Sequence, residues 1–211
     1  MPEKYKEITK KLLSEQATQV VPGHGNPDAD IMFIGEAPGA KEDAQGKPFV
    51  GPAGKFLDEL LKSIDLKRED VWISNMVKVR PPENRDPEED EIQEYKPWLD
   101  EEIEIIDPKV FVPLGRFALG KFIPGQQISK VHGKGFKRGG KLYFAMYHPA
   151  AALYKGSMRS VLIDDMQNLK RILEGDESLV ESLEDTVSEV QELLKKSKDS
   201  KEEEKQMGLG I

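Results

Sequence analysis

The stretch from residue 31 to residue 54 constrains the fold of this chain more than any other. Ile31–Ile34 is an unbroken apolar run, which is typical of a strand buried on both faces of a sheet. The run ends in Gly35-Glu36-Ala37-Pro38-Gly39, whose glycines permit tight turns and a close backbone approach to a ligand. Two carboxylates and Phe49 follow. The stretch is compatible with a pocket for a flat polar ligand or with an ordinary strand-to-helix connection.

Expected strands and helices alternate along the chain. Apolar runs predict strands over 31–34, 71–75, 109–114 and 142–147, and helical spacing predicts helices over 3–16, 52–64, 87–106, 116–122 and 158–173. Asp86 and Pro87 have the form of a helix start. The basic, glycine-rich segment 124–141 is expected to form a loop or hairpin. This order predicts an α/β protein, a three-layer α/β/α sandwich with a central four-stranded parallel sheet.

Length and composition limit the domain organisation. The 211 residues suffice for one substantial domain, expected over 1–174, and 175–211 is expected to be an acidic tail, helical or disordered. No apolar run approaches the ~20 residues that span a bilayer, and the N-terminus lacks the apolar stretch of a signal peptide. We therefore expect a cytoplasmic protein without membrane contact. The chain has no cysteine, which excludes disulfides and thiolate metal sites.

The charge is unevenly distributed. The net charge is −8, yet residues 109–173 carry 12 basic and 2 acidic side chains. A basic segment in an acidic chain indicates a surface for phosphates, although a merely solvated surface gives the same count.

Several ordered motifs resemble those of the family 4 uracil-DNA glycosylases, the thermostable type. The first is Gly35–Gly39 with Glu42-Asp43 and Gly46–Gly54. The others are Val20–Gly23 with Gly25–Pro27, Ser74–Lys78, Arg80–Pro82 with Asn84–Pro87, and His148–Ala151, so that the resemblance spans roughly residues 8–173. It implies the uracil-DNA glycosylase fold and a monomeric, monofunctional enzyme that flips uracil out of DNA and hydrolyses its N-glycosidic bond, initiating base excision repair. The alternative is a protein that binds uracil-containing DNA without cleaving it and is tethered to the sliding clamp.

The resemblance and the residue chemistry together give a set of candidate site residues. Phe49 is expected to stack on uracil, Asn75 to pair with O4 and N3–H of the base, and His148 to donate to O2 as negative charge builds there. The family resemblance implies a catalytic role for Glu36, which would orient or deprotonate water and stabilise the cationic sugar. Glu42 is expected to shape the pocket floor. Backbone groups of Ala37 and Gly39 are expected to contact the base.

Loops supply the candidates for DNA contact. Leu153 and Tyr154 follow the His-Pro-Ala motif and are expected to wedge into the gap left by the flipped base. The expected phosphate ligands are Lys155, Arg159, Lys134, Arg138, Arg80 and Arg85.

The chain departs from its family at four positions. Family 4 members usually hold a four-iron four-sulfur cluster on four cysteines, and the corresponding residues here are Ile8, Lys11, Val79 and Tyr95. Because such clusters need thiolates, we expect no cluster and no other cofactor. Ile8, Val79 and Tyr95 are expected to lie near one another and to replace the cluster by apolar packing. Natural loss and engineered removal of the cysteines both remain open.

The last six residues, Gln206–Ile211, resemble the short peptides by which bacterial repair proteins hold the sliding clamp. A polar tether that ends in apolar anchors suits a groove on such a partner, whereas a tail without function is the alternative.

Overall fold

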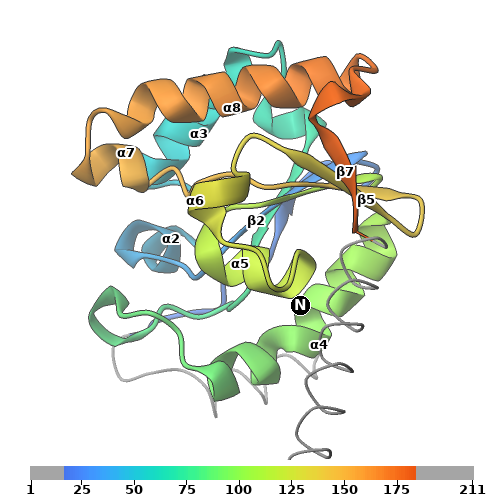
Figure 1. Ribbon diagram of the computed structural model, residues 1–211. Coiled ribbons are helices and arrows are strands. Elements are labelled where there is room, and N and C mark those ends of the chain that lie inside the picture. The colour runs from blue at the N-terminus through green and yellow to red at the C-terminus, as the bar shows by residue number, and fades with distance from the viewer. Residues whose placement is uncertain (1–16, 184–211) are drawn as a thin grey trace, which may run out of the picture.

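A mixed β-sheet forms the centre of the protein, whose computed structural model describes residues 17–183 (Figure 1). Within these residues the sheet has seven strands in the order β1-β3-β2-β4-β6-β5-β7. The strands are β1 His24–Gly25, β2 Ile31–Gly35, β3 Trp72–Asn75, β4 Val110–Pro113, β5 Gly135–Arg138, β6 Lys141–Phe144 and β7 Val180–Ser182.

The predicted four-stranded parallel sheet is confirmed as the middle of this larger sheet. Strands β3, β2, β4 and β6 pair in parallel. The structure adds β1 and β5, which pair antiparallel with β3 and β6, and β7, which pairs in parallel with β5. Strand β7 lies beyond residue 174, so the sheet extends into the segment that the sequence assigned to the tail.

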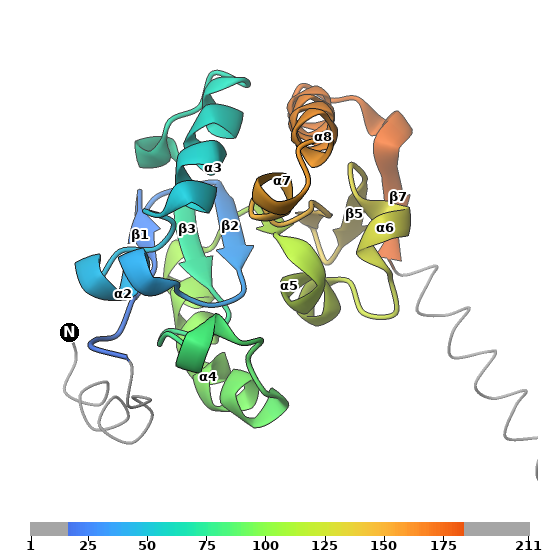
Figure 2. The ribbon, with the colours of Figure 1, turned by 90° about the vertical axis from the view of Figure 1, so that its left-hand side faces the viewer.

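Helices cover both faces of the sheet. In the described part of the chain they are α2 Ala40–Gln45, α3 Pro52–Lys62, α4 Glu89–Ile106, α5 Gly115–Phe122, α6 Ile128–Val131, α7 Ala151–Tyr154 and α8 Met158–Leu173, with short 3₁₀ turns at Arg68–Asp70, Pro82–Asn84 and Glu177–Leu179. Figure 2 shows α3 and α8 above the sheet and α4 and α5 below it, which is the predicted three-layer arrangement.

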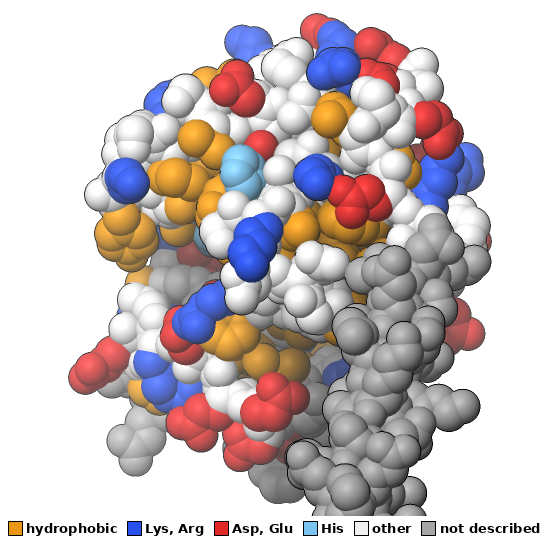
Figure 3. All heavy atoms as spheres, viewed as in Figure 1, with side chains coloured by type: hydrophobic (Ala, Val, Ile, Leu, Met, Phe, Trp, Pro, Cys, Tyr) orange, Lys and Arg blue, Asp and Glu red, His pale blue; other side chains and the backbone are white. Residues whose placement is uncertain are grey.

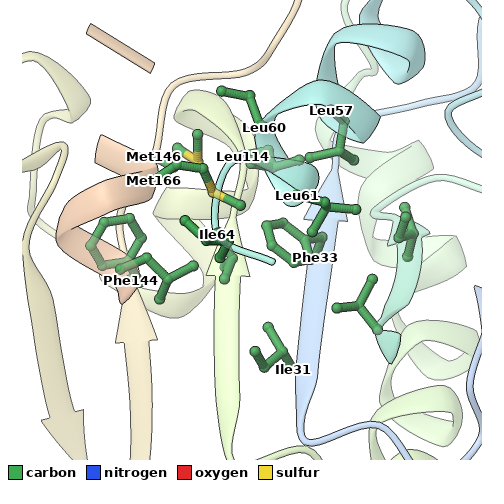
Figure 4. Close-up of a cluster of buried hydrophobic side chains, with 14 of the residues drawn as sticks. Ile31, Phe33, Leu57, Leu60, Leu61, Ile64, Leu114, Phe144, Met146 and Met166 are labelled. Carbon is green, nitrogen blue, oxygen red and sulfur yellow. The ribbon is translucent and has the colours of Figure 1, made fainter. Parts of the chain in front are cut away.

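Strand β2 explains the three layers, because all five of its residues are buried. Ile31 and Phe33 pack in one hydrophobic cluster with α3 and α8, part of which Figure 4 shows. Met32 and Ile34 alternate with them and pack in a second cluster with α4 and α5. A strand with apolar side chains on both faces needs a helical layer on each side.

Helix α4 begins later than predicted. Its N-cap is Glu88, whose backbone N–H donates to Glu91 at 2.8 Å. The prediction of Asp86 as the cap is wrong, because the Asp86 carboxylate instead pairs with Arg116 at the start of α5.

The ends of the parallel strands place the site. Gly35 at the end of β2 is in register with Asn75 at the end of β3, and Leu114 after β4 bridges Met146 after β6. The loops that follow these strands therefore leave the same edge of the sheet. Helices α2 and α7 lie at one end of the molecule in Figure 1.

Three predictions lie outside the described residues: the helix over 3–16, the cluster positions Ile8 and Lys11, and the peptide Gln206–Ile211. Among the helices of residues 17–183, none has the length and the apolar character needed to cross a membrane.

Candidate active site

A cavity of about 190 Å³ opens where the parallel strands end. Its walls come from the loop after β2, α2 and the loop that follows it, the start of α3, the end of β3, the loop after β6, and α7. The lining residues are Ala37, Gly39, Glu42, Phe49, Gly51, Pro52, Ala53, Asn75, His148 and Leu153. The structure thus brings together every residue for which the sequence predicts a contact with the base. The volume is below the range of drug-sized pockets and suits a small ring.

Phe49 is held in an unusual backbone conformation. Its φ is 53°, in the left-handed region, and its side chain is 4% exposed. The guanidinium of Arg68 fixes the conformation by donating to the carbonyls of Pro48 and Phe49 at 3.0 and 2.5 Å. Gly54 leaves the room that this loop needs, since a Cβ there would lie 1.7 Å from the Phe49 oxygen. A strained residue persists only where its surroundings determine it in this way.

Glu42 supports the same loop. One carboxylate oxygen, Oε1, accepts from the backbone N–H groups of Val50 and Gly51 at 2.9 and 2.7 Å. Gly51 is the N-cap of α3, so the carboxylate lies at the positive end of that helix. Glu42 therefore joins α2 to the Phe49 loop while lining the cavity.

Gly35 lets the two principal side chains of the cavity meet. A Cβ on Gly35 would lie 2.5 Å from Oδ1 of Asn75 and 2.6 Å from Cζ of Phe49. Only a residue without a side chain permits this approach. Asn75 itself is 2% exposed, so its amide is shielded from bulk water.

His148 is a neutral donor in this setting. Its Nδ1 accepts from the Ala150 backbone N–H at 3.2 Å, which leaves the proton of the neutral ring on Nε2. Burial lowers the pKa of His148 to about 4, although the Glu42 carboxylate acts in the opposite direction. The imidazole centroid lies 5.4 Å from that of Phe49, with the rings tilted by 34°.

Glu36 lies beside the cavity and is not among its lining residues. It follows β2 directly, and its backbone carbonyl accepts from the N–H of Val77 at 3.0 Å. Burial raises the pKa of Glu36 to about 7, the Asp86 carboxylate acts in the same direction, and Arg116 opposes them. A carboxyl with a pKa near neutrality is suited to accepting a proton.

Comparison with known proteins identifies the family. The sequence profile of the Uracil DNA glycosylase superfamily matches residues 22–171. The Type-4 uracil-DNA glycosylase of Sulfurisphaera tokodaii is 48% identical over 166 residues, which cover 74% of this chain and 75% of that protein. Those of Saccharolobus solfataricus and Archaeoglobus fulgidus are 49% and 46% identical, covering 72% and 74% of this chain and 76% and 83% of those proteins. The chain belongs to the type-4 uracil-DNA glycosylase family.

This type-4 family member does not fit the iron–sulfur cluster that the resemblance implied. Val79 and Tyr95, at two of the four positions, are each 3% exposed and lie in the same apolar cluster, where Tyr95 packs edge-on against Trp98. Neither side chain supplies a thiolate, and the chain has no cysteine. Within residues 17–183, no group of three or more histidines, cysteines or acidic residues converges on a metal site. The expected proximity of Ile8, Val79 and Tyr95 stays a prediction: Val79 and Tyr95 belong to the same buried cluster, and Ile8 lies outside the described residues.

Two apolar side chains on α7 flank the cavity. Leu153 and Tyr154 are 52% and 91% exposed, and Leu153 also lines the cavity. Apolar side chains gather on the surface around α7 in Figure 3. Contiguous exposed apolar patches are typical of surfaces that contact a partner.

Most of the predicted phosphate ligands already have partners within the protein. Lys134 pairs with Glu181, Arg85 with Glu91, and Arg159 with Glu59. Arg80 donates to Asn84, and Arg138 donates to the Phe122 carbonyl and lies over the Tyr143 ring. Lys155 is exposed, and its ammonium has no acidic partner among residues 17–183.

Sequence reasoning missed Arg68, Asp86 and Arg116. Arg68 stands in Lys67-Arg68-Glu69-Asp70, which reads as an ordinary surface charge run, and its carbonyl partners are 19 and 20 residues away. Asp86 was interpreted as a helix cap. No sequence signal connected Arg116 with Glu36.

Proposed function

We propose that this chain is a uracil-DNA glycosylase that flips uracil out of DNA and hydrolyses its N-glycosidic bond. The observation that carries the proposal is the small cavity in which an aromatic ring, a buried amide and a neutral imidazole converge. The names of its type-4 relatives agree with this function. A base within a duplex is out of reach of such a cavity, so the nucleotide has to be extruded first.

Base recognition is assigned to Phe49 and Asn75. The Phe49 ring stacks on the face of uracil. The Asn75 amide oxygen accepts from N3–H and its NH₂ group donates to O4, a pattern that cytosine reverses. Because the side chain is shielded from water, a mismatched base leaves polar groups unpaired, and that costs more than at an exposed site.

Departure of the base is assigned to His148. As the C1′–N1 bond breaks, its electron pair passes into the base and negative charge grows on O2. The Nε2–H of His148 donates to that oxygen and stabilises the charge. With a pKa of about 4, the ring is neutral at physiological pH, so it acts as a hydrogen-bond donor and keeps its proton.

Glu36 is assigned to the sugar side of the reaction. Its place beside the base cavity suits a group that acts on the water attacking C1′ and on the positive charge of the sugar. The ionised carboxylate takes the proton of the water as the C1′–O bond forms.

DNA binding is assigned to the surface around α7. Leu153 and Tyr154 fill the space that the flipped nucleotide vacates, and Lys155 contacts a neighbouring phosphate. Lys134, Arg85 and Arg159 reach phosphates by exchanging their acidic partners for them. Arg80 and Arg138 do so by giving up their bonds to Asn84 and to the Phe122 carbonyl. We also propose that the glycosylase domain, predicted over residues 1–174, extends through β7 at Val180–Ser182. We further propose that the protein acts as a cytoplasmic monomer, with Gln206–Ile211 as a tether to the sliding clamp.

The test is strand cleavage after alkali on oligonucleotides that carry one uracil, with thymine and cytosine at the same position as controls and no added iron. Glu36→Ala and His148→Ala are compared with matched controls, Glu104→Ala on the exposed side of α4 and His24→Ala in exposed strand β1. We expect uracil-dependent cleavage that falls at least about a hundredfold in the two site variants and stays unchanged in the controls.

Two outcomes would contradict the proposal. Tight binding to uracil-containing DNA without cleavage would favour a non-cleaving binding protein. Equal losses in the site variants and their controls would show that this cavity is not the active site.

A further inference from the structure

A lysine is completely buried three residues after Asn75. The Lys78 side chain has no exposure and donates to three oxygens: Ser74 Oγ at 2.6 Å, the Asn75 backbone carbonyl at 2.9 Å and Glu102 Oε2 at 2.7 Å. An ammonium group has three N–H donors, so all of them are used. The pocket residues do not include Lys78, and the reaction proposed above gives it no role.

The Lys78 network joins three parts of the fold. Glu102 lies on α4, and its carboxylate also accepts from Ser74 Oγ at 2.5 Å and from the Gly23 backbone N–H at 2.9 Å. The end of β3 is thereby fixed to α4 on one face of the sheet and to the segment that precedes β1.

Stability alone is a weak reason for a charge at this position. An ammonium loses its hydration on burial, and apolar side chains of similar volume often replace buried ion pairs without loss of stability. The distinctive feature of the network is its bond to the Asn75 carbonyl. That carbonyl lies at the end of β3, where the ladder with β2 closes through Met76 N–H and the Gly35 carbonyl.

We propose that Lys78 is a positioning residue for base recognition: it fixes the main chain of Asn75 so that the Asn75 amide is presented to the base in one orientation. The Asn75 side chain already packs closely against Gly35, because its Oδ1 lies 2.5 Å from the position that a Gly35 Cβ would take. The hydrogen bond from Lys78 to the Asn75 carbonyl restricts a second motion, the rotation of the peptide group that follows Asn75. This inference rests on the proposed glycosylase function and on the role assigned to Asn75.

The experiment is a double-mutant cycle on the single-turnover rate of uracil release at saturating DNA. Lys78→Met is combined with Glu102→Gln, which removes both charges and leaves an amide that bonds Ser74 and Gly23. This pair of changes is measured with Asn75 intact and in an Asn75→Ala background. With Asn75 intact we expect the single-turnover rate to fall about tenfold, because the flipped base is bound in a less productive orientation. The dissociation constant for DNA should stay unchanged. In the Asn75→Ala background we expect less than about a twofold further fall.

A structural role would give a different pattern. Equal fold-losses in the two backgrounds, or no loss with Asn75 intact, would overturn the inference, as would an Asn75→Ala variant with the rate of the wild type. If the charge-free variant does not fold, the cycle is repeated with Lys78→Arg, which keeps the ion pair but replaces three diverging donors by a planar fork.

The same measurements separate this inference from the proposed function. A wild-type protein that releases no uracil would refute the function itself. A wild-type protein that releases uracil, slowed by Asn75→Ala but with independent effects of the two sites, would refute only the role of Lys78.

Discussion

The pH dependence of uracil release should follow the ionisation of Glu36. Burial and the Asp86 carboxylate raise the pKa of Glu36 to about 7, and Arg116 limits the rise. Only the ionised carboxylate accepts a proton from water, so kcat/KM should increase with pH through this value. His148, with a pKa of about 4, stays neutral throughout the same range.

The size of the effect follows from the titration of one group. With a pKa of about 7, the carboxylate is about 9% ionised at pH 6 and about 91% ionised at pH 8, so kcat/KM should rise about tenfold between them and then level off. A glutamate with the ordinary pKa of 4.5 would be ionised at both pH values, and kcat/KM would then not change between them.

Two neighbours allow the origin of the shift to be tested. Asp86→Asn removes the carboxylate that raises the pKa of Glu36, so the midpoint of the profile should move to lower pH. Arg116→Gln removes the opposing positive charge, so the midpoint should move to higher pH. Glu36→Gln should be slow, with a pH-independent residual rate. The assays need constant ionic strength, because phosphate contacts make DNA binding depend on salt.

Thermal unfolding provides a second readout with a definite sign. Between the ordinary pKa of 4.5 and about 7, the folded protein holds more protons at Glu36 than the unfolded chain does, so this group lowers stability as pH rises. Glu36→Gln should therefore raise Tm relative to wild type more at pH 8 than at pH 5. A wild-type kcat/KM that does not change between pH 6 and 8 would refute the reasoning. So would midpoints of the kcat/KM profile that shift in the same direction in Asp86→Asn and Arg116→Gln.

Four further substitutions test the geometry of the cavity. His148→Ala should lower the single-turnover rate by about 10²–10³-fold. His148→Gln, which restores an N–H donor, should recover part of this loss. Gly54→Ala should lower Tm by several degrees, because its Cβ would lie 1.7 Å from the Phe49 oxygen; an unchanged melting curve would contradict this geometry. Arg68→Met should slow uracil release while leaving DNA affinity within about twofold, measured by fluorescence anisotropy, since it loosens only the Phe49 loop. Tyr154→Ala should weaken DNA binding in the same assay, and an unaltered dissociation constant would remove the wedge role.

The centre of the sheet could be predicted because its strands are buried on both faces. Such strands carry unbroken apolar runs, as in Ile31–Ile34, and the helices between them repeat their apolar residues at helical spacing. The edge strands gave no such signal. Strand β1 has two residues, and β7 lies in an acidic segment with only one partly buried position.

The meeting of the site residues could be predicted for a related reason. Parallel strands end at one edge of a sheet, so residues that follow different strands converge there even when they are far apart in sequence. Gly35 and Asn75 are in register, although 40 positions separate them. The conformation of Phe49 could not be predicted, because it depends on a guanidinium from another loop and on the space at Gly54.

The basic segment 109–173 shows what a count of charged residues does not reveal. Lys109, Lys121, Lys141 and Lys170 all belong to this segment, and each pairs with an acidic residue elsewhere in the chain. These ion pairs form only in the folded protein and cannot be recognised in the sequence, where Lys170 and its partner Asp65 are 105 positions apart.

Within residues 109–173, a DNA phosphate therefore meets few lysines and arginines that lack an acidic partner in the described part of the chain. Exposed ion pairs contribute only about 0–1 kcal/mol each, so a phosphate that replaces a carboxylate, as at Arg159 or Lys134, gains a partner at little cost in stability. The carboxylate that is released then repels the DNA, and this repulsion offsets part of the gain. Affinity should consequently depend more on the cavity and on the apolar side chains of α7 than the number of lysines and arginines suggests.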